Sequence, residues 1–174
     1  MNTVSHWISR LEKFLESPHS PKPSPLNDFE PCRDPLLVEG LSEALPQIFE
    51  DRSLAVFMRL AALFDSGAML EKTPQGWSCV GLASFGEIHS PPQALQNIFI
   101  PEVKITQVLR KKVDLLSEQL LALPIPKPAR GHALLFRPCD RISFLMFSGL
   151  ADPWLKEHTE KVQHQLLNCF AEGE

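Results

Sequence analysis

Apolar residues near the N-terminus recur at the spacing of one face of an α-helix. They follow the i, i+3, i+4, i+7 pattern without a miss, and polar residues of both charge signs occupy the other positions. This apolar stripe consists of Val4, Trp7, Ile8, Leu11, Phe14 and Leu15. A helix of about 13 residues is marginal by itself in water. The stripe therefore needs a partner, which is its own domain, a second copy or another protein, and we favour the last two.

The next stretch, residues 17–35, interrupts this pattern with six prolines among Ser, Asn and Asp residues. Proline is disfavoured in helix interiors and central strands, and the other three residue types favour turns. We expect a semi-rigid spacer of polyproline character. A P-x-x-P ligand that begins at Pro18 is the alternative.

From Leu36 onward, helical spacing and strand-like apolar runs alternate, with turn residues between them. Ser53 is the expected cap of one helix, and Pro74 and Gly76 lie in the expected turn of a hairpin. The expected elements are helices over 36–49 and 54–65, strands over 68–72 and 77–84, a helical turn near 90–93, an extended stretch over 97–105, a helix over 106–123, strands over 133–137 and 142–147, and a last helix that begins at Asp152-Pro153. The expected core face of that last helix is Trp154, Leu155, His158, Val162, Leu166, Leu167 and Phe170.

These elements predict the fold class and the domain organisation. Two hairpins imply an antiparallel sheet, because parallel strand pairs need long crossover connections. We expect an α+β domain in which helices flank an antiparallel sheet. The chain then divides into an amphipathic helix over 1–16, a Pro-rich linker over 17–35 and the α+β domain over 36–174.

The C-terminal sequence FLMFSGLADPWLKEHTEKVQHQLLNCF resembles the end of a GAF domain, with an apolar strand, a small-residue and acidic loop, and a long helix. The pair of helices before the first hairpin also suits a GAF start, so the resemblance covers roughly residues 40–171. It implies an antiparallel sheet with helices on both sides and often a small-molecule pocket on one face. GAF domains act mostly as sensors, dimerisation modules or protein-binding modules. The N-K-x-F-D-E set of the cyclic-nucleotide-binding members and the cysteine setting of the bilin-binding members are both missing. PAS-like and profilin-like folds are the alternatives.

Composition and charge exclude several classes of function. The net charge of −4 argues against general nucleic-acid binding, and the basic cluster 110–112 is expected to be the solvated face of a helix. Neither a glycine-rich phosphate loop nor a tyrosine is present. No apolar run is long enough to span a membrane, and no signal peptide is visible, so we expect a cytoplasmic protein with no membrane association.

Cysteine and histidine offer the few candidates for chemistry. Cys139 lies in a predicted turn beside two arginines, a setting that can lower a thiol pKa, and it is the candidate reactive thiol. Cys79 and Cys169 are expected in the core. His158 and His164 lie about 240° apart around one helix and cannot share a metal ion. We therefore expect no catalytic residue, no metal and no cofactor.

The sequence favours a non-enzymatic signalling or scaffold module, in which the apolar stripe of the N-terminal helix binds a protein partner or a second copy to form a dimer. A GAF-type pocket leaves open the sensing of an unknown small ligand. One alternative is a cysteine-dependent reductase, because a GAF-fold enzyme of that kind reduces free methionine sulfoxide. The other alternative is a purely structural subunit.

Overall fold

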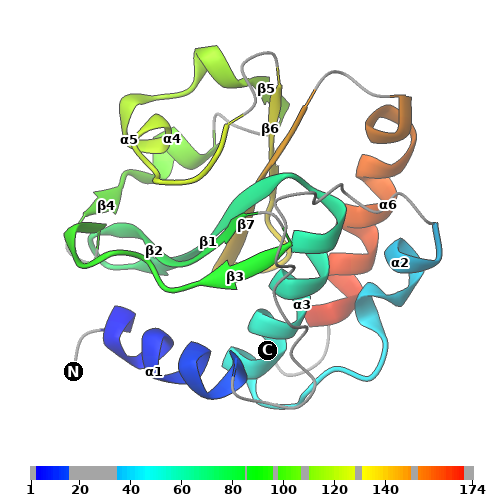
Figure 1. Cartoon of the computed structure of the whole chain (residues 1–174), viewed down its shortest axis with the longest axis horizontal. Coiled ribbons are helices and arrows are strands. Elements are labelled where there is room, and N and C mark those ends of the chain that lie inside the picture. The colour runs from blue at the N-terminus through cyan, green and yellow to red at the C-terminus, as the bar shows by residue number, and fades with distance from the viewer. Residues whose placement is uncertain are drawn as a thin grey trace.

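An antiparallel sheet lies at the centre of the computed structural model, which describes residues 3–15, 35–84, 86–95, 98–106, 110–127, 131–149 and 153–170 (Figure 1). Its strands are β1 (Ser66–Thr73), β2 (Gly76–Ser84), β3 (Glu87–His89), β4 (Phe99–Ile100), β5 (Arg110–Lys112), β6 (His132–Phe136) and β7 (Ile142–Ser148). The α-helices are α1 (Thr3–Leu15), α2 (Pro35–Glu39), α3 (Phe49–Leu63), α4 (Glu102–Thr106), α5 (Glu118–Leu121) and α6 (Pro153–Phe170). The α+β class is therefore confirmed. The proline-rich residues 17–34 lie outside the described residues, so the linker stays a prediction.

The strand order is β3-β2-β1-β7-β6-β5, and β4 also pairs with β2. All of these pairings are antiparallel. Both hairpins that the sequence predicts, β1–β2 and β6–β7, are present. The first one turns where expected, and Gly76 there adopts a φ of 134°, a conformation that a side chain disfavours. Because β1 pairs with β7, residues far apart in the sequence meet at the centre of the sheet.

Helices cover the two faces of the sheet unequally (Figure 1). The helices α1, α3 and α6 contribute buried side chains to one core cluster together with one face of the sheet. The short elements around α4 and α5 contribute to a second cluster on the opposite face. Alternation along the strands divides the residues between the two, so that Met69 belongs to the first cluster and Leu70 to the second.

The expected helix over 36–49, with a kink or an end at Pro46, is wrong in extent. Here α2 ends at Glu39, a 3₁₀ turn follows over Gly40–Ser42, and the chain is then irregular until α3 begins at Phe49. Glycine and proline at positions 40 and 46 both disfavour a continuous helix, which explains the break. The expected cap is also wrong, because Ser53 lies inside α3 and donates its hydroxyl to the Phe49 carbonyl at 2.8 Å.

The expected helix over 106–123 is the largest error. The chain forms the edge strand β5, a 3₁₀ turn over Val113–Leu115 and the one-turn helix α5. The buried apolar residues of these short turns have the sequence spacing of a helix face, and this spacing led to the wrong prediction. They are Val113, Leu116, Leu120 and Leu123. The basic cluster 110–112 consequently lies on a sheet edge that pairs with β6, and not on a helix.

The C-terminal part agrees more closely with the sequence. The last helix, α6, begins at Pro153 as expected, and it buries Val162, Leu166 and Phe170. Leu167, expected in the core, is exposed. The side chains of Trp154 and Leu155 lie outside the described residues. No helix in the described part of the chain has the length and hydropathy needed to cross a membrane.

Candidate docking site of the N-terminal helix

The apolar stripe of α1 packs on this chain's own core. Trp7 and Leu11 are fully buried in the cluster that α3 and the sheet share, and Ile8 packs partly against it. The side chains of Val4, Phe14 and Leu15 lie outside the described residues. Of the three partners that the sequence allows, the structure thus contains the chain's own domain. Binding of the stripe to a second copy or another protein stays a prediction, and it requires α1 to leave the sheet.

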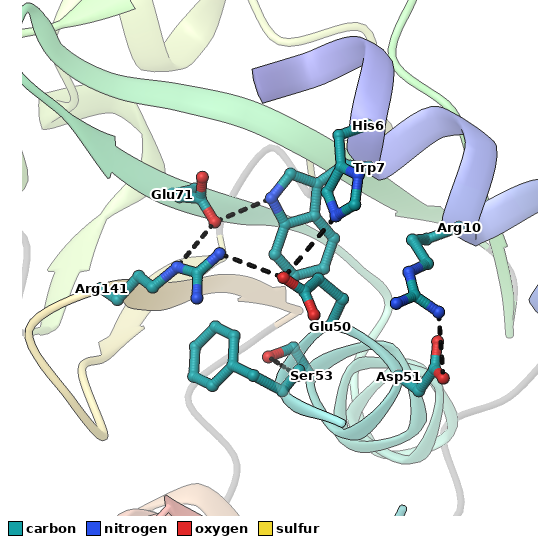
Figure 2. A network of polar contacts seen from close by, with 9 residues as sticks. His6, Trp7, Arg10, Glu50, Asp51, Ser53, Glu71 and Arg141 are labelled. Atoms are coloured by element: carbon teal, nitrogen blue, oxygen red, sulfur yellow. Dashed lines mark hydrogen bonds and ion pairs between the residues drawn. The ribbon is translucent and has the colours of Figure 1, made fainter. Parts of the chain in front are cut away.

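A buried carboxylate accepts the hydrogen bond of the docked indole (Figure 2). Glu71 on β1 is 4% exposed, and its Oε2 accepts a hydrogen bond from Trp7 Nε1 at 2.7 Å. The same oxygen accepts a hydrogen bond from Arg141 Nε at 3.2 Å. Burial raises the pKa of Glu71 above its usual value, and the hydrogen bonds from Trp7 and Arg141 offset only part of that rise. One carboxylate therefore connects α1, β1 and the turn before β7.

Arg141 continues this network to the N-terminus of α3. Its Nη2 donates to Glu50 Oε1 at 3.3 Å, and its guanidinium lies 4.3 Å from the centre of the Phe49 ring. Desolvation alone would raise the pKa of Glu50, but a backbone hydrogen bond and the Arg141 guanidinium outweigh it, so the pKa is lowered. The backbone N–H of Lys72 also donates to the Arg141 carbonyl at 2.9 Å, which fixes the turn against β1.

Two further ion pairs lie along the rim between α1 and α3 (Figure 2). His6 Nε2 is 3.6 Å from Glu50 Oε1, and Arg10 Nη1 is 3.5 Å from Asp51 Oδ2. The acidic partners occupy the first turn of α3, where the helix dipole favours negative charge. The helix α1 therefore presents hydrogen-bond donors and positive charge to an acidic rim.

Below this network lies a hydroxyl without a partner. Ser78 on β2 pairs in register with Glu71, so the two side chains share the sheet face that α1 covers. Ser78 is 1% exposed, and its Oγ has no hydrogen-bond partner among the described residues. Because an unsatisfied buried hydroxyl is costly, the polar fit between α1 and this part of the sheet is incomplete.

A second cluster of the same composition lies on the opposite face of the sheet. Trp77 Nε1 donates to Glu102 Oε2 at 2.5 Å, and Arg137 Nη1 donates to Glu102 Oε1 at 2.6 Å. The guanidinium lies 5.0 Å from the centre of the Trp77 ring. Desolvation would raise the pKa of Glu102, but the hydrogen bonds from Arg137 and Trp77 together lower it. This cluster ties the short helix α4 to the β1–β2 hairpin.

One serine–histidine contact lies at the edge of the sheet. Ser84 Oγ on β2 is 3.0 Å from His89 Nε2 on β3, and burial lowers the pKa of His89. A neutral imidazole beside a hydroxyl is the arrangement that a general base needs. The two strands are antiparallel neighbours, however, and such cross-strand contacts are a normal part of a ladder.

Two clefts lie beside α2 and not over a face of the sheet, where the GAF resemblance implies a pocket. A cleft of about 510 Å³ opens against α6, with His158, Lys161 and Gln165 among its lining residues. Another of about 500 Å³ opens against α3, with Met58 and Arg59 among its lining residues. Both have mixed linings, and the described residues contain no cluster suited to hold a metal ion.

The candidate thiol is less accessible than expected. Cys139 follows β6 in the expected turn, but it is 9% exposed and belongs to the core cluster of the α3 face. Cys79 and Cys169 are buried, as expected, and burial raises their pKa values to about 12 and about 11. A thiol chemistry that needs an exposed, acidified cysteine therefore has little support among the three described cysteines.

The sequence pattern does not single out Glu71, Arg141 or Ser78 as parts of a site. A signal existed for the first, because Glu71 directly follows the apolar residues 68–70 within a predicted strand. No signal existed for its pairing with Arg141, which lies 70 residues away.

No family model matches this chain, and no curated protein or solved structure shows significant similarity to it. Its function must therefore be inferred from the geometry of the α1 site.

Proposed function

We propose that this chain is a non-enzymatic binding module in which α1 is a releasable docking element for a protein partner or a second copy. The observation that carries the proposal is the mode of attachment of α1. Among the side chains of α1 that the structure describes, Trp7 and Leu11 are fully buried, and the Trp7 indole N–H donates to the buried carboxylate of Glu71.

The free energy of docking of α1 is small enough for the helix to detach and dock again. Burial of Trp7 and Leu11 contributes about 2–3 kcal/mol each, and the partly buried Ile8 adds to this. The rim pairs at His6 and Arg10 are partly exposed and add little. Ordering of a helix of 13 residues opposes these gains. The net free energy of docking is then a few kcal/mol. A competing helix that binds the same surface with a more favourable free energy can displace α1.

Native-state hydrogen exchange tests whether α1 opens separately from the rest of the chain. We expect the amides of α1 to exchange through a local opening whose free energy is well below that of global unfolding, while those of β1 and β7 report the global value. Exchange of α1 at the same free energy as β1 and β7 would contradict the proposal.

A variant that loosens α1 while leaving its stripe intact tests what the released helix does. In Glu71→Ala the indole N–H and Arg141 lose their shared acceptor, so we expect faster exchange in α1 and a molar mass that rises with concentration in light scattering. Addition of Trp7→Ala should return the mass to that of a monomer. The matched control is Glu102→Ala in the second cluster, which should leave exchange in α1 unchanged.

We place the module in the GAF-like or PAS-like group of signalling and scaffold domains, again as a proposal. Its support is the antiparallel sheet with helices on both sides and the long helix directly after the last strand. A cytoplasmic location fits Cys79 and Cys169, which are buried thiols outside any disulfide. A small molecule retained by the purified protein in native mass spectrometry would add a sensing role.

A further inference from the structure

We infer that the groove beneath α1 recognises an amphipathic helix of another protein that carries the pattern basic-Trp-x-x-basic-Leu. In this chain α1 is the built-in, weaker occupant of that groove. The inference rests on the proposed release of α1 and specifies the chemistry of a partner for the groove that α1 vacates. The pattern is taken from His6, Trp7, Arg10 and Leu11, each of which has a defined counterpart on the domain.

The apolar half of the pattern is a pair spaced four residues apart. Trp7 and Leu11 lie on the same side of α1, and both are fully buried between the sheet and α3. The indole must also place its N–H at Glu71, 2.7 Å away, and this requirement favours Trp over Phe at the first position. A buried carboxylate that lost this donor would be left with Arg141 alone.

The polar half of the pattern faces three carboxylates. Glu71 takes the indole N–H, Glu50 faces His6, and Asp51 faces Arg10. On the domain side, the cation that contacts this set is Arg141, which bridges Glu71 and Glu50. The occupant must therefore bring donors and positive charge on both sides of the Trp, and an acidic helix would be repelled.

The contacts of α1 with the groove are not optimal, so another helix could bind there more tightly. The rim contacts of His6 and Arg10, at 3.6 and 3.5 Å, are longer than good charge-assisted hydrogen bonds. His6 is also charged only when protonated, whereas Arg or Lys at that position is charged at every physiological pH. The Ser78 hydroxyl is still free for one more hydrogen bond. Each of these gains is available to another helix without any change in the groove.

An external helix fits these facts better than a second copy. The helix α1 belongs to the same chain as the groove, so its docking is an intramolecular step that a separate molecule must outcompete. The α1 of a second copy offers the same contacts and would lose this competition at micromolar protein concentration. Only an occupant with better contacts can displace α1 under those conditions.

The test uses a fluorescein-labelled peptide of residues 1–16 that carries His6→Arg, titrated with the full chain while anisotropy is measured. A chain with His6→Glu and Arg10→Glu provides a vacated groove, because its own α1 is repelled by Glu50 and Asp51 and no core side chain is truncated. Trp7→Ala in the chain is a second way to vacate the groove. We expect the peptide to bind the vacated chains at least tenfold more tightly than the unaltered chain.

The controls distinguish recognition of the basic-Trp-x-x-basic-Leu pattern from nonspecific attraction between a basic peptide and an acidic surface. Peptides that carry Trp7→Ala or Arg10→Glu should bind at least tenfold more weakly, and Glu71→Ala in the vacated chain should have a similar effect. Glu102→Ala in the vacated chain should leave the affinity unchanged. The His6→Arg peptide should bind several-fold more tightly than the native peptide at low salt, and this difference should shrink at high salt.

Three results would overturn the inference. One is no binding to either vacated chain while circular dichroism shows both to be folded. Another is binding that does not depend on Trp7 of the peptide or Glu71 of the chain. The third is a dimer of the unaltered chain at micromolar concentration that the peptide competes away, which would make a second copy the occupant. The proposed function fails by a different measurement, namely hydrogen exchange of α1 only through global unfolding.

Discussion

Two clusters of Trp, Glu and Arg lie on opposite faces of one sheet, and they differ mainly in burial. In the first, the Glu71 side chain is 6% exposed and lies under α1, whereas the Glu102 side chain of the second is 42% exposed on α4. Each carboxylate accepts an indole N–H and a guanidinium donor. The pKa of Glu71 is nevertheless raised and that of Glu102 lowered. Desolvation is the largest cause of the raised pKa of Glu71, and the nearby Glu50 carboxylate raises it further, whereas Lys72 helps to lower the pKa of Glu102.

The two clusters also differ in what they hold. Trp7 and Glu71 are 64 residues apart, and their contact attaches α1, which contributes no strand to the sheet. Trp77 and Glu102 are 25 residues apart, and Trp77 itself lies in a strand of the sheet. Under the proposed function, the same chemistry holds a releasable helix on one face of the sheet and a permanent element on the other.

The largest expected difference concerns the two indoles. Trp77→Ala should lower the free energy of unfolding by about 3–5 kcal/mol, because it leaves a cavity within the sheet. Trp7→Ala should cost at most the free energy of docking of α1, about 2–3 kcal/mol, because α1 can detach instead. Urea unfolding followed by circular dichroism measures both changes. Equal losses would show that α1 is as integral to the fold as β2.

Replacement of Arg141 and of Arg137 by Ala should lower the free energy of unfolding by different amounts, but the difference should be smaller than that between the two Trp variants. Arg141→Ala leaves Glu71 buried with only Trp7 as a donor, and we expect a loss of about 1–3 kcal/mol in the free energy of unfolding. Arg137→Ala leaves an exposed carboxylate that water can solvate, and the loss should be about 0.5 kcal/mol. Thermal unfolding of both variants in the same buffer gives the comparison. A larger loss for Arg137→Ala would contradict the assigned role of burial.

The contributions of Glu71 and Glu102 to the free energy of unfolding should depend on pH in opposite directions. Glu71 has a raised pKa in the folded state, so it binds its proton more tightly there, and its contribution to stability falls as pH rises from about 4.5 through that folded value. Glu102 has a lowered pKa, so its contribution is present above about 4.5 and is lost as pH falls through the folded value. The free energy of unfolding of Glu71→Gln and Glu102→Gln, measured against the unaltered chain from pH 3 to 7, should therefore diverge in opposite directions. Parallel profiles would refute the contrast.

The first cluster also shows where prediction from the sequence succeeds and where it stops. The stripe of Trp7 and Leu11 was visible because helical spacing is a local property, and the β1–β2 turn was visible because Pro74 and Gly76 are local signals. The pairing of Glu71 with Arg141 depends on the register between β1 and β7, in which Glu71 lies opposite Ile142. No local pattern encodes that register.

The error over residues 106–123 has the same origin. Leu116 and Leu120 are buried as a helix face would bury them, yet the chain between β5 and β6 achieves this with short turns. Pairing of Lys111 with Ala133 adds a strand to the sheet at that point, and tertiary pairing overrides the local helical preference.

The smallest expected effect concerns Ser78 and Ser143, two fully buried strand residues whose hydroxyls have no hydrogen-bond partner among the described residues. Ser78 shares the face of Glu71, and Ser143 lies on the opposite face beside Leu70 in the register of β1 with β7. Each Ser→Ala change removes an unsatisfied hydroxyl and should raise the free energy of unfolding by about 0.5–1 kcal/mol. If an external helix uses the Ser78 hydroxyl, Ser78→Ala should also weaken binding of a peptide with a polar residue near that hydroxyl, and Ser143→Ala should not. A stability gain at both sites together with a binding loss at Ser78 alone would show that only the hydroxyl beneath α1 is available for recognition.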